Sequence, residues 1–494
     1  MIQKLVACLF VFVNLSTTGG MSTAQPLRFV GFDLGTSGAR ISVIESLTSA
    51  SEEYREVHSE AIRWDENGTY DDADAWMNAI LRLFKGASDS LGSLESVVSV
   101  CVSGTSASCL MINRDTKEVT RKPRMYNYDV IGSSEKEKTS FAKEAMELLE
   151  THAPPRHTAR ARTGSLAKLL TWIKEKELEE NEVLCHQSDF ISLKLMDQSI
   201  SPVKSDFHNC LKLGYDVRER KWPTWIDDCL QDAGVTNPIS GNGIIPLDIV
   251  SPGQPMGTIS TEMAKSLGLS EDCVVVGGTT DSNAAFFAAA GTRPSFGTAV
   301  TSLGSTLAMK QLSQQYVEDA TRGVYSHRFP NFDDPDAEAW LVGGASNVGC
   351  VILRELDFSN EELEQLSNSI DPMTDSPLVY YPLTKPGERF PVADANKEPL
   401  LKPVPKDRKD FLHGILQSIG DVESEGFHVL QQLGAPPPSL VWTCGGGSKN
   451  EMWNKLRERR LCSKFDRKDI SVKRAECTEA SFGAALLAAA TFSS

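Results

Sequence analysis

Short apolar runs that end in glycine-rich polar turns recur along the chain and predict buried strands. Leu27 to Phe32 ends in a turn that begins at Asp33, and an apolar pattern resumes from Ala39 to Ile44. Strand, tight turn, strand is the expected structure, because glycines in the turn permit backbone geometries that side chains forbid. Ser96 to Val102 is a β-branched run and is expected to form a further buried strand.

Other segments between these runs have apolar residues spaced as in helices. Asp74 to Phe84 and Ala167 to Lys176 carry apolar residues at the spacing of amphipathic helices. The buried-strand run Cys273 to Val276 leads through glycines and threonines to Asp281, and small residues from Asn283 to Ala290 then predict a helix.

A second unit is expected to begin near Asp272, because strands and a Gly/Ser/Thr turn that carries or precedes an aspartate open both halves of the chain. The stretch from Asn237 to Pro255 is rich in Gly, Pro and Asn and suits an interdomain connection. Pro382 to Pro405 is rich in proline and charge and is expected to be a surface excursion. The pattern predicts two α/β domains, 27–271 and 272–494, with a cleft between them.

The N-terminal segment 1–26 allows three interpretations. Its apolar run, Leu5 to Val13, is too short to span a bilayer but suits a targeting signal, so plastid import is one expectation. The segment could instead be an upstream extension with Met21 as the start, which would favour a cytoplasmic protein, or it could be a buried strand.

Composition narrows the class of protein. The chain has 494 residues, of which 40% are hydrophobic and 23% charged, as in an ordinary soluble globular protein. Its net charge of −16 argues against nucleic acid or an anionic membrane as the main partner. Eleven cysteines without CxxC spacing indicate reduced thiols in an intracellular compartment.

Two segments carry candidate phosphate chemistry. The turn from Gly31 to Arg40 can surround phosphate oxygens with backbone N–H groups and hydroxyls, and the carboxylate of Asp33 suits Mg²⁺. Gly445 to Asn450 follows an apolar run, and its three consecutive glycines let a planar ligand approach the backbone closely. Each segment alone can also be an ordinary turn. The second is neither a Walker A loop nor a Rossmann fingerprint.

Taken together, these segments resemble the FGGY carbohydrate kinases of the actin-like ATPase superfamily, from about Phe29 to Ala490. Five motifs carry the resemblance, and they follow one another in family order. They are similar to the first phosphate motif (Asp33 to Arg40), the segment that holds the catalytic aspartate (Gly278 to Asp281), the second phosphate motif (Ser302 to Thr306), the adenosine motif (Gly445 to Asn450) and the closing helix (Glu476 to Ala485).

The resemblance implies two actin-like (ribonuclease H-like) ATPase domains that flank a central cleft, with ATP and Mg²⁺ as cofactors and a small sugar as acceptor. It assigns the general-base role to Asp281 and places Asp33 on Mg²⁺ and the phosphates, on the opposite domain, so that closure would bring them together. The residues expected at the ATP are Thr36, Ser37, Gly38, Arg40, Gly304, Ser305, Thr306, Asn347, Gly446, Gly447 and Asn450. The residues expected at the sugar are Asp33, Thr105, Ser106, Asp129 and Asp281.

Structural interpretations stand beside several of these roles. Asp281 precedes the predicted helix and is well placed to cap it, which is compatible with catalysis because capping orients a carboxylate. Thr105 and Ser106 can form an ordinary strand-to-loop turn, and Asn347 a buried turn amide.

The sugar is suggested by a departure from the family pattern. Xylulose kinases usually carry Ser-Gly-Gln-Met-His-Gly after the third strand, whereas this chain has Ser103-Gly104-Thr105-Ser106-Ala107-Ser108. The next expected sugar loop, Tyr126-Asn127-Tyr128-Asp129, only partly resembles the usual Trp-Asn-Asp-x-Arg. The plant and cyanobacterial xylulose-kinase-like proteins that act on D-ribulose are more similar to this chain at Ser188-Asp189-Phe190, Ser205-Asp206 and Leu213-Gly214-Tyr215-Asp216. D-Ribulose kinase is therefore expected. The alternatives are a D-xylulose or other FGGY sugar or polyol kinase, a non-kinase actin-like ATPase, and a silent sugar sensor.

Overall fold

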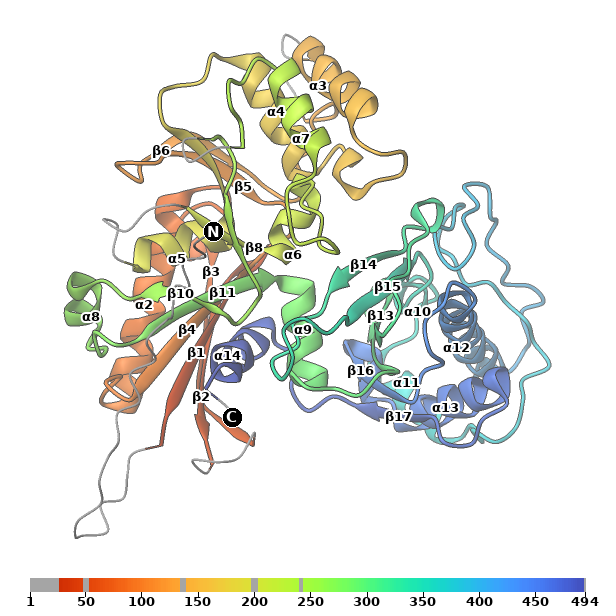
Figure 1. The fold of residues 1–494 in the computed structure, drawn as a ribbon. Helices are drawn as coiled ribbons and strands as arrows, with labels where there is room; N and C mark the ends of the chain where they lie inside the picture. The colour runs from red at the N-terminus through yellow and green to blue at the C-terminus, as the bar shows by residue number, and fades with distance from the viewer. Residues whose placement is uncertain (1–25, 48–52, 134–138, 197–202, 240–242, 493–494) are drawn as a thin grey trace.

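Two mixed β-sheets of six strands organise the part of the chain that the structure describes, residues 26–47, 53–133, 139–196, 203–239 and 243–492 (Figure 1). The structure is a computed structural model. Residues 1–25, which hold the apolar run of the possible targeting signal, lie outside the described residues, so the three interpretations of this segment stay predictions.

The first sheet contains the predicted hairpin and the buried strands that follow it. Its order is β10 (Pro255–Thr258), β11 (Val274–Thr280), β4 (Val97–Gly104), β1 (Arg28–Leu34), β2 (Gly38–Ser46) and β3 (Tyr54–Arg63). β1 and β2 are antiparallel, as the turn chemistry predicts, whereas β4 runs parallel to both β1 and β11. The central strands are buried on both faces, which explains why they read as continuous apolar runs.

Helices cover both faces of this sheet. The predicted amphipathic helix is α2 (Ala73–Leu91), and its buried stripe packs beside β2 and β3. On the other side lie α9 (Asp281–Ala290) and the alanine-rich α14 (Ala480–Ala490). At Gly31 a Cβ would lie 2.1 Å from the backbone nitrogen of Ala485, so only glycine permits this close approach of α14 to β1.

A smaller cap with its own apolar core rises from the first domain (Figure 1). Its sheet has the order β6 (Val119–Arg124), β5 (Cys109–Asn113) and β7 (Glu182–His186). Its main helices are α3 (Thr139–His152), α4 (Ser165–Glu175) and α7 (Thr224–Asp232), and α4 is the second helix predicted from spacing. The remaining short elements of this half are α1 (Trp64–Asn67), η2 (Thr158–Arg160), α5 (Gln187–Leu195), β8 (Lys204–Asp206), α6 (Phe207–Cys210), η3 (Leu211–Leu213), β9 (Asp248–Val250) and α8 (Thr261–Leu267).

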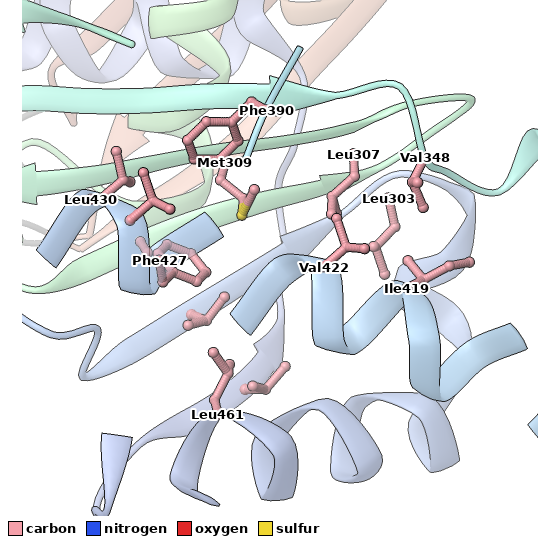
Figure 2. Close-up of a cluster of buried hydrophobic side chains, with 14 of the residues drawn as sticks. Leu303, Leu307, Met309, Val348, Phe390, Ile419, Val422, Phe427, Leu430 and Leu461 are labelled. Atoms are coloured by element: carbon pink, nitrogen blue, oxygen red, sulfur yellow. The ribbon is translucent and has the colours of Figure 1, made fainter. Parts of the chain in front are cut away.

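The second sheet has the order β14 (Tyr325–Arg328), β15 (Trp340–Ser346), β13 (Leu307–Ser313), β12 (Thr298–Leu303), β16 (Leu440–Cys444) and β17 (Ser471–Arg474). The long helix α12 (Arg408–Gln432) packs on it, and α13 (Glu451–Phe465) packs on α12. Figure 2 shows the apolar side chains between these layers, with Met309 and Phe390 facing Phe427. The other elements of this half are η4 (Ala320–Arg322), α10 (Val351–Glu355), α11 (Asn360–Asn368) and η5 (Gly446–Lys449).

The change from one sheet to the other falls later than the sequence suggested. We expected β11 to open the second domain, but it pairs with β4 in the first sheet. The C-terminal α14, expected in the second domain, packs against β1, β2 and β4 of the first. Neither position could be predicted, because the composition of an apolar segment does not show which distant strands it pairs with or packs against.

The thiols agree with the reduced state expected from cysteine spacing. All ten cysteines within the described residues are free. No helix in the same part of the chain is both long and apolar enough to cross a membrane.

Candidate active site

Asp33 stands at the end of β1, directly before the turn to β2. Its register partners are Arg40 on β2 and Ser103 on β4, and the Ser103 hydroxyl donates to Asp33 Oδ1 at 2.7 Å. The turn is closed by the Gly35 N–H, which donates to the Gly38 carbonyl at 2.9 Å. One carboxylate is thus fixed at the strand end beside an open polar turn.

Asp281 stands at the end of β11 and is the first residue of α9. Its Oδ1 accepts a hydrogen bond of 2.6 Å from the Ser282 N–H, so the helix start orients the carboxylate. Gly104 of β4 pairs with Leu34 on one side and Thr280 on the other. Two strand spacings, about 10 Å, therefore separate the strand ends that carry the two aspartates.

The expectation that Asp33 and Asp281 lie on opposite domains is therefore wrong. Both stand at the same edge of the first sheet, because the parallel strands β1, β4 and β11 all end there. Domain closure is not needed to bring these two carboxylates together.

The two carboxylates interact electrostatically. Burial, followed by the charge of Asp281, raises the pKa of Asp33 from 3.8 to about 7. Burial also raises the pKa of Asp281, against the opposing effects of the Ser282 N–H, Lys310 and Lys212. A cation bound at this edge of the sheet would favour the ionised form of Asp33.

This donor set fits Mg²⁺ as it is bound with a nucleotide. Mg²⁺ prefers carboxylate oxygen and usually takes only one or two protein carboxylates, with phosphate oxygens and water completing its shell. The described residues contain no group of three or more His, Cys, Asp or Glu side chains placed to hold a metal ion by themselves. Asp33 would thus share the ion with a phosphate ligand rather than belong to a protein-only cage.

Two lysines that the sequence reasoning missed lie beside Asp281. Lys310 on β13 donates to Ser282 Oγ at 3.0 Å and to Asn283 Oδ1, so it joins the second sheet to the first turn of α9. Burial lowers the pKa of Lys310 to about 7, although Asp281 opposes the shift. Burial also lowers the pKa of Lys212 in η3. For Lys310, the signal available in the sequence was a lysine within a strand of mainly apolar residues.

The phosphate-motif residues lie at two exposed turns. Thr36 and Ser37 form the tip of the β1–β2 turn, and Ser305 and Thr306 are exposed in the β12–β13 turn that begins at Gly304. Arg40 is partly committed elsewhere, because its guanidinium forms an ion pair with Glu479, which precedes α14. Its charge still lowers the pKa of Asp33.

The expected sugar loops are close to each other, but two of their side chains are bound within the protein. The Thr105 hydroxyl is buried and donates to Gln187 Oε1 at 3.0 Å. Asp129 Oδ1 accepts from the Ile131 and Gly132 N–H groups and pairs with Arg162. These partners assign Thr105 and Asp129 to holding the loops, whereas Ser106 is half-buried at the end of β4.

Two asparagines expected at the adenosine also have partners within the protein. Asn450 Oδ1 caps α13 by accepting from the Trp453 N–H at 3.0 Å, and its Nδ2 donates to Ser367 Oγ. Asn347 Nδ2 donates to the Gly387 carbonyl at 3.0 Å, as the buried-turn interpretation predicted. An asparagine after a glycine cluster is equally suited to capping the next helix and to binding a ligand, so sequence could not separate the two roles.

Glycines in the same loop do leave room for a ligand. Gly446 is exposed, and a Cβ built there would meet nothing within 4 Å, so packing within the protein does not require a glycine. At Gly447 a Cβ would come within 2.7 Å of the Trp453 ring. Gly447 is thus needed by the fold, and the surface at Gly446 is open.

A cavity of about 290 Å³ opens between the two halves of the molecule. Its walls include Arg156, His157 and Thr158 from the cap, and Tyr325 from β14. The pKa of Tyr325 is raised by burial and by the charge of Asp281, so the cavity and this carboxylate are near each other.

Comparison with known structures identifies the fold. A xylulose kinase from Bifidobacterium adolescentis superimposes with a TM-score of 0.70 and 17% identity, covering 95% of this chain and 94% of that one. A glycerol kinase from Plasmodium falciparum, solved with ADP, gives a TM-score of 0.71 and 14% identity, covering 94% and 89%. The two α/β domains thus have the actin-like ATPase fold, as expected from the resemblance.

Sequence comparison identifies the family. The N-terminal domain model of the FGGY family of carbohydrate kinases matches residues 28–288, and the C-terminal domain model matches residues 258–492. A xylulose kinase from Staphylococcus epidermidis is 23% identical over 473 residues, 93% of this chain and 87% of that protein. The chain belongs to the FGGY family of carbohydrate kinases, and it is an ATP-dependent sugar kinase.

Proposed function

We propose that the protein phosphorylates a free ketopentose, most specifically D-ribulose to D-ribulose 5-phosphate, with Asp281 as the general base. The observation that carries the proposal is the meeting of Asp33 and Asp281 at one sheet edge, in a chain that belongs to this family. A sugar hydroxyl is a poor nucleophile near neutral pH, and a carboxylate within reach of its proton makes it a better one.

Asp281 would accept the proton of the attacking hydroxyl. Its orientation is set by the Ser282 N–H, and the charges of Lys310 and Lys212 favour its ionised form. Burial acts in the opposite direction and makes the carboxylate a stronger base. The net effect is a raised pKa for Asp281, which favours the uptake of a proton from the attacking hydroxyl.

Asp33 would hold Mg²⁺, together with oxygens of the ATP phosphates, and when bound the ion would neutralise phosphate charge. Ser103 orients this carboxylate, and Thr36 and Ser37 are exposed in the turn that follows it. The turn at Gly304 to Thr306 would bind phosphate from the second sheet. Phosphoryl transfer asks the protein mainly for such positioning and charge stabilisation.

The two halves would then have different tasks. The first domain, residues 27–271 with β11 and α14 added, would bind the sugar and Mg²⁺. The second would bind adenosine at Gly446 and Gly447, near the cap of α13. Closure would bring nucleotide to acceptor and exclude water, which would otherwise divert transfer into hydrolysis.

The assignment of D-ribulose as the substrate rests on Ser106 and its small neighbours, which stand where xylulose kinases usually carry Met-His. D-Xylulose is the second candidate, because the Staphylococcus epidermidis relative is a xylulose kinase. Action in the plastid or the cytoplasm stays a prediction, since it depends on the N-terminal residues.

A panel of free sugars tests the substrate. With ATP and Mg²⁺, D-ribulose is expected to give sugar-dependent ADP formation with a kcat/KM at least about tenfold above that of D-xylulose, since pocket contacts typically discriminate by roughly 10–200-fold. D-Ribose, L-ribulose and glycerol serve as comparisons, and a reaction without sugar as the baseline. A higher kcat/KM for D-xylulose or for a polyol would overturn the substrate assignment and leave the family unaffected.

A further inference from the structure

Lys168 is a fully buried lysine on α4, where amphipathic spacing alone would place an apolar residue. Its side chain has 0% exposure. In the part of the chain that the structure describes, no carboxylate lies within ion-pair distance of its ammonium group. Desolvating an unpaired cation costs several kcal/mol, so packing does not explain this residue.

The ammonium group is held by two backbone carbonyls. Lys168 Nζ donates to the Ala107 carbonyl at 2.8 Å and to the Met125 carbonyl at 2.6 Å. Ala107 lies in the loop after β4, with φ at +64°, a left-handed conformation uncommon for a residue with a Cβ. Met125 directly follows β6 and directly precedes the second expected sugar loop, Tyr126 to Asp129. One side chain therefore ties together two loops that are 18 residues apart in sequence.

A second contact joins the same two loops. The Tyr126 N–H donates to Ser108 Oγ at 2.8 Å, and Ser108 shares a hydrogen bond with Thr105. Thr105 is in turn bound to Gln187 at the start of α5. The connected set, which we call the loop anchor, consists of Lys168, Ser108, Thr105 and Gln187.

The loop anchor lies at the acceptor end of the candidate site, because Thr105 directly follows Gly104, and Gly104 pairs with Thr280, the residue before Asp281. Lys212 is also an electrostatic neighbour of both Lys168 and Asp281. Burial lowers the pKa of Lys168 to about 8, and the positive charges of Lys212 and Arg124 act in the same direction. A buried lysine in such surroundings lowers the stability of the fold. The Lys168 side chain extends from α4 to the loops that would meet the sugar.

We propose that Lys168 is a positioning residue for the sugar: by binding the Ala107 and Met125 carbonyls, it fixes the loops that present Ser106 to the acceptor. The inference rests on the proposed function. The loop anchor lies within the first domain and its cap, whereas adenosine would bind on the second, so its loss should act on the sugar and leave the nucleotide unaffected.

Lys168→Met tests this directly, because methionine keeps an unbranched chain and removes the ammonium group. KM for the ketopentose is expected to rise roughly 10–100-fold, since misplacing a substrate-positioning group by about 1 Å can cost about 10². KM for ATP should stay within about twofold and kcat within about threefold. Lys174→Met on the same helix is the control, because Lys174 is half-buried and donates a longer hydrogen bond, of 3.3 Å, to the Ala233 carbonyl, outside the loop anchor.

Hydrogen exchange gives a readout that does not depend on activity. In Lys168→Met the amides of Ser108 and Tyr126 should exchange at least about tenfold faster than in the wild-type protein, whereas amides of α12 should be unchanged. Ser108→Ala removes the second contact and is expected to raise the sugar KM in the same direction by a smaller factor. It serves in place of Lys168→Met if that variant does not fold.

The possible outcomes separate the two claims. A wild-type sugar KM together with unchanged exchange in Lys168→Met would overturn the positioning role. Equal increases in the KM values for sugar and ATP would overturn it too, because they would indicate general damage. Failure of the wild-type protein to phosphorylate any ketopentose would refute the proposed substrate, and hydrogen exchange would still test the loop anchor.

Discussion

Asp281→Asn is expected to lower kcat by roughly 10³-fold, within the range that a general base contributes. The amide is isosteric with the carboxylate and can still accept from the Ser282 N–H at the start of α9. It cannot take up the proton of the sugar hydroxyl. Because the proposed adenosine surface at Gly446 and Gly447 lies on the second domain, ATP affinity should change by less than about threefold.

The measurements are steady-state kinetics and calorimetric titration with a non-hydrolysable ATP analogue. Asp272→Asn is the control, since Asp272 is exposed in the loop before β11 and should have wild-type turnover. Turnover of Asp281→Asn within about fivefold of wild type would remove Asp281 from the role of base. A loss of analogue binding in the same variant would instead make Asp281 a nucleotide or metal residue.

Asp33→Asn is expected to inactivate the protein and to stabilise it at alkaline pH. Activity should fall by roughly 10²–10³-fold, as when a single charge-stabilising group is removed from a polar site. The free energy of unfolding should increase, because burial and the charge of Asp281 disfavour the ionised form of Asp33 in the folded protein. A site kept for function at the expense of stability is expected to behave in this way.

The pH dependence follows from the direction of the shift. The pKa of Asp33 is about 7 in the folded protein against 3.8 for the free carboxyl, so the folded state binds this proton more tightly. Ionisation of Asp33 therefore lowers the stability of the wild type as pH rises from about 4 to 7. Without nucleotide or Mg²⁺, the variant should exceed the wild type by about 1–3 kcal/mol at pH 8 and by less at pH 5.

Urea unfolding at the two pH values measures this difference. The control Asp89→Asn alters an exposed pair with Lys85 and should shift stability by less than about 0.5 kcal/mol. An Asp33→Asn variant that is less stable than wild type at pH 8 would contradict the account of a buried carboxylate held against its own desolvation.

The sequence predicted the local structure around the candidate site well, because that structure follows from short segments of the chain. The β1–β2 hairpin, the strand that ends at Ser103 and the helix that begins at Asp281 all follow from short patterns of apolar residues, glycines and a capping aspartate. The resemblance to the FGGY kinases supplied the family and the fold.

What the sequence could not predict depends on partners distant along the chain. The position of β11 beside β4, and of α14 against β1, follows from tertiary pairing and placed both aspartates on one sheet. The Asn450 side chain caps α13 and binds the distant Ser367. Neither partner can be recognised from the residue type, which suggested a ligand contact instead. Lys168 escaped notice because a lysine on an amphipathic helix is usually solvated, and its carbonyl partners are 43 and 61 residues away.

These results change the part that domain closure would play. With Asp33 and Asp281 already at one edge, the acceptor half of the site would be formed before nucleotide closes over it. In the proposed mechanism, closure would then deliver the phosphoryl group rather than assemble the carboxylates. An ATPase that only switches shape would not need a base aimed at an acceptor.

The most direct test is to follow the fate of the phosphoryl group by ³¹P NMR in a reaction with ATP, Mg²⁺ and D-ribulose. The account predicts a new phosphomonoester signal that grows in step with ADP, with neither appearing when the sugar is left out. Release of inorganic phosphate at the same rate with and without the sugar, and no phosphomonoester, would contradict it.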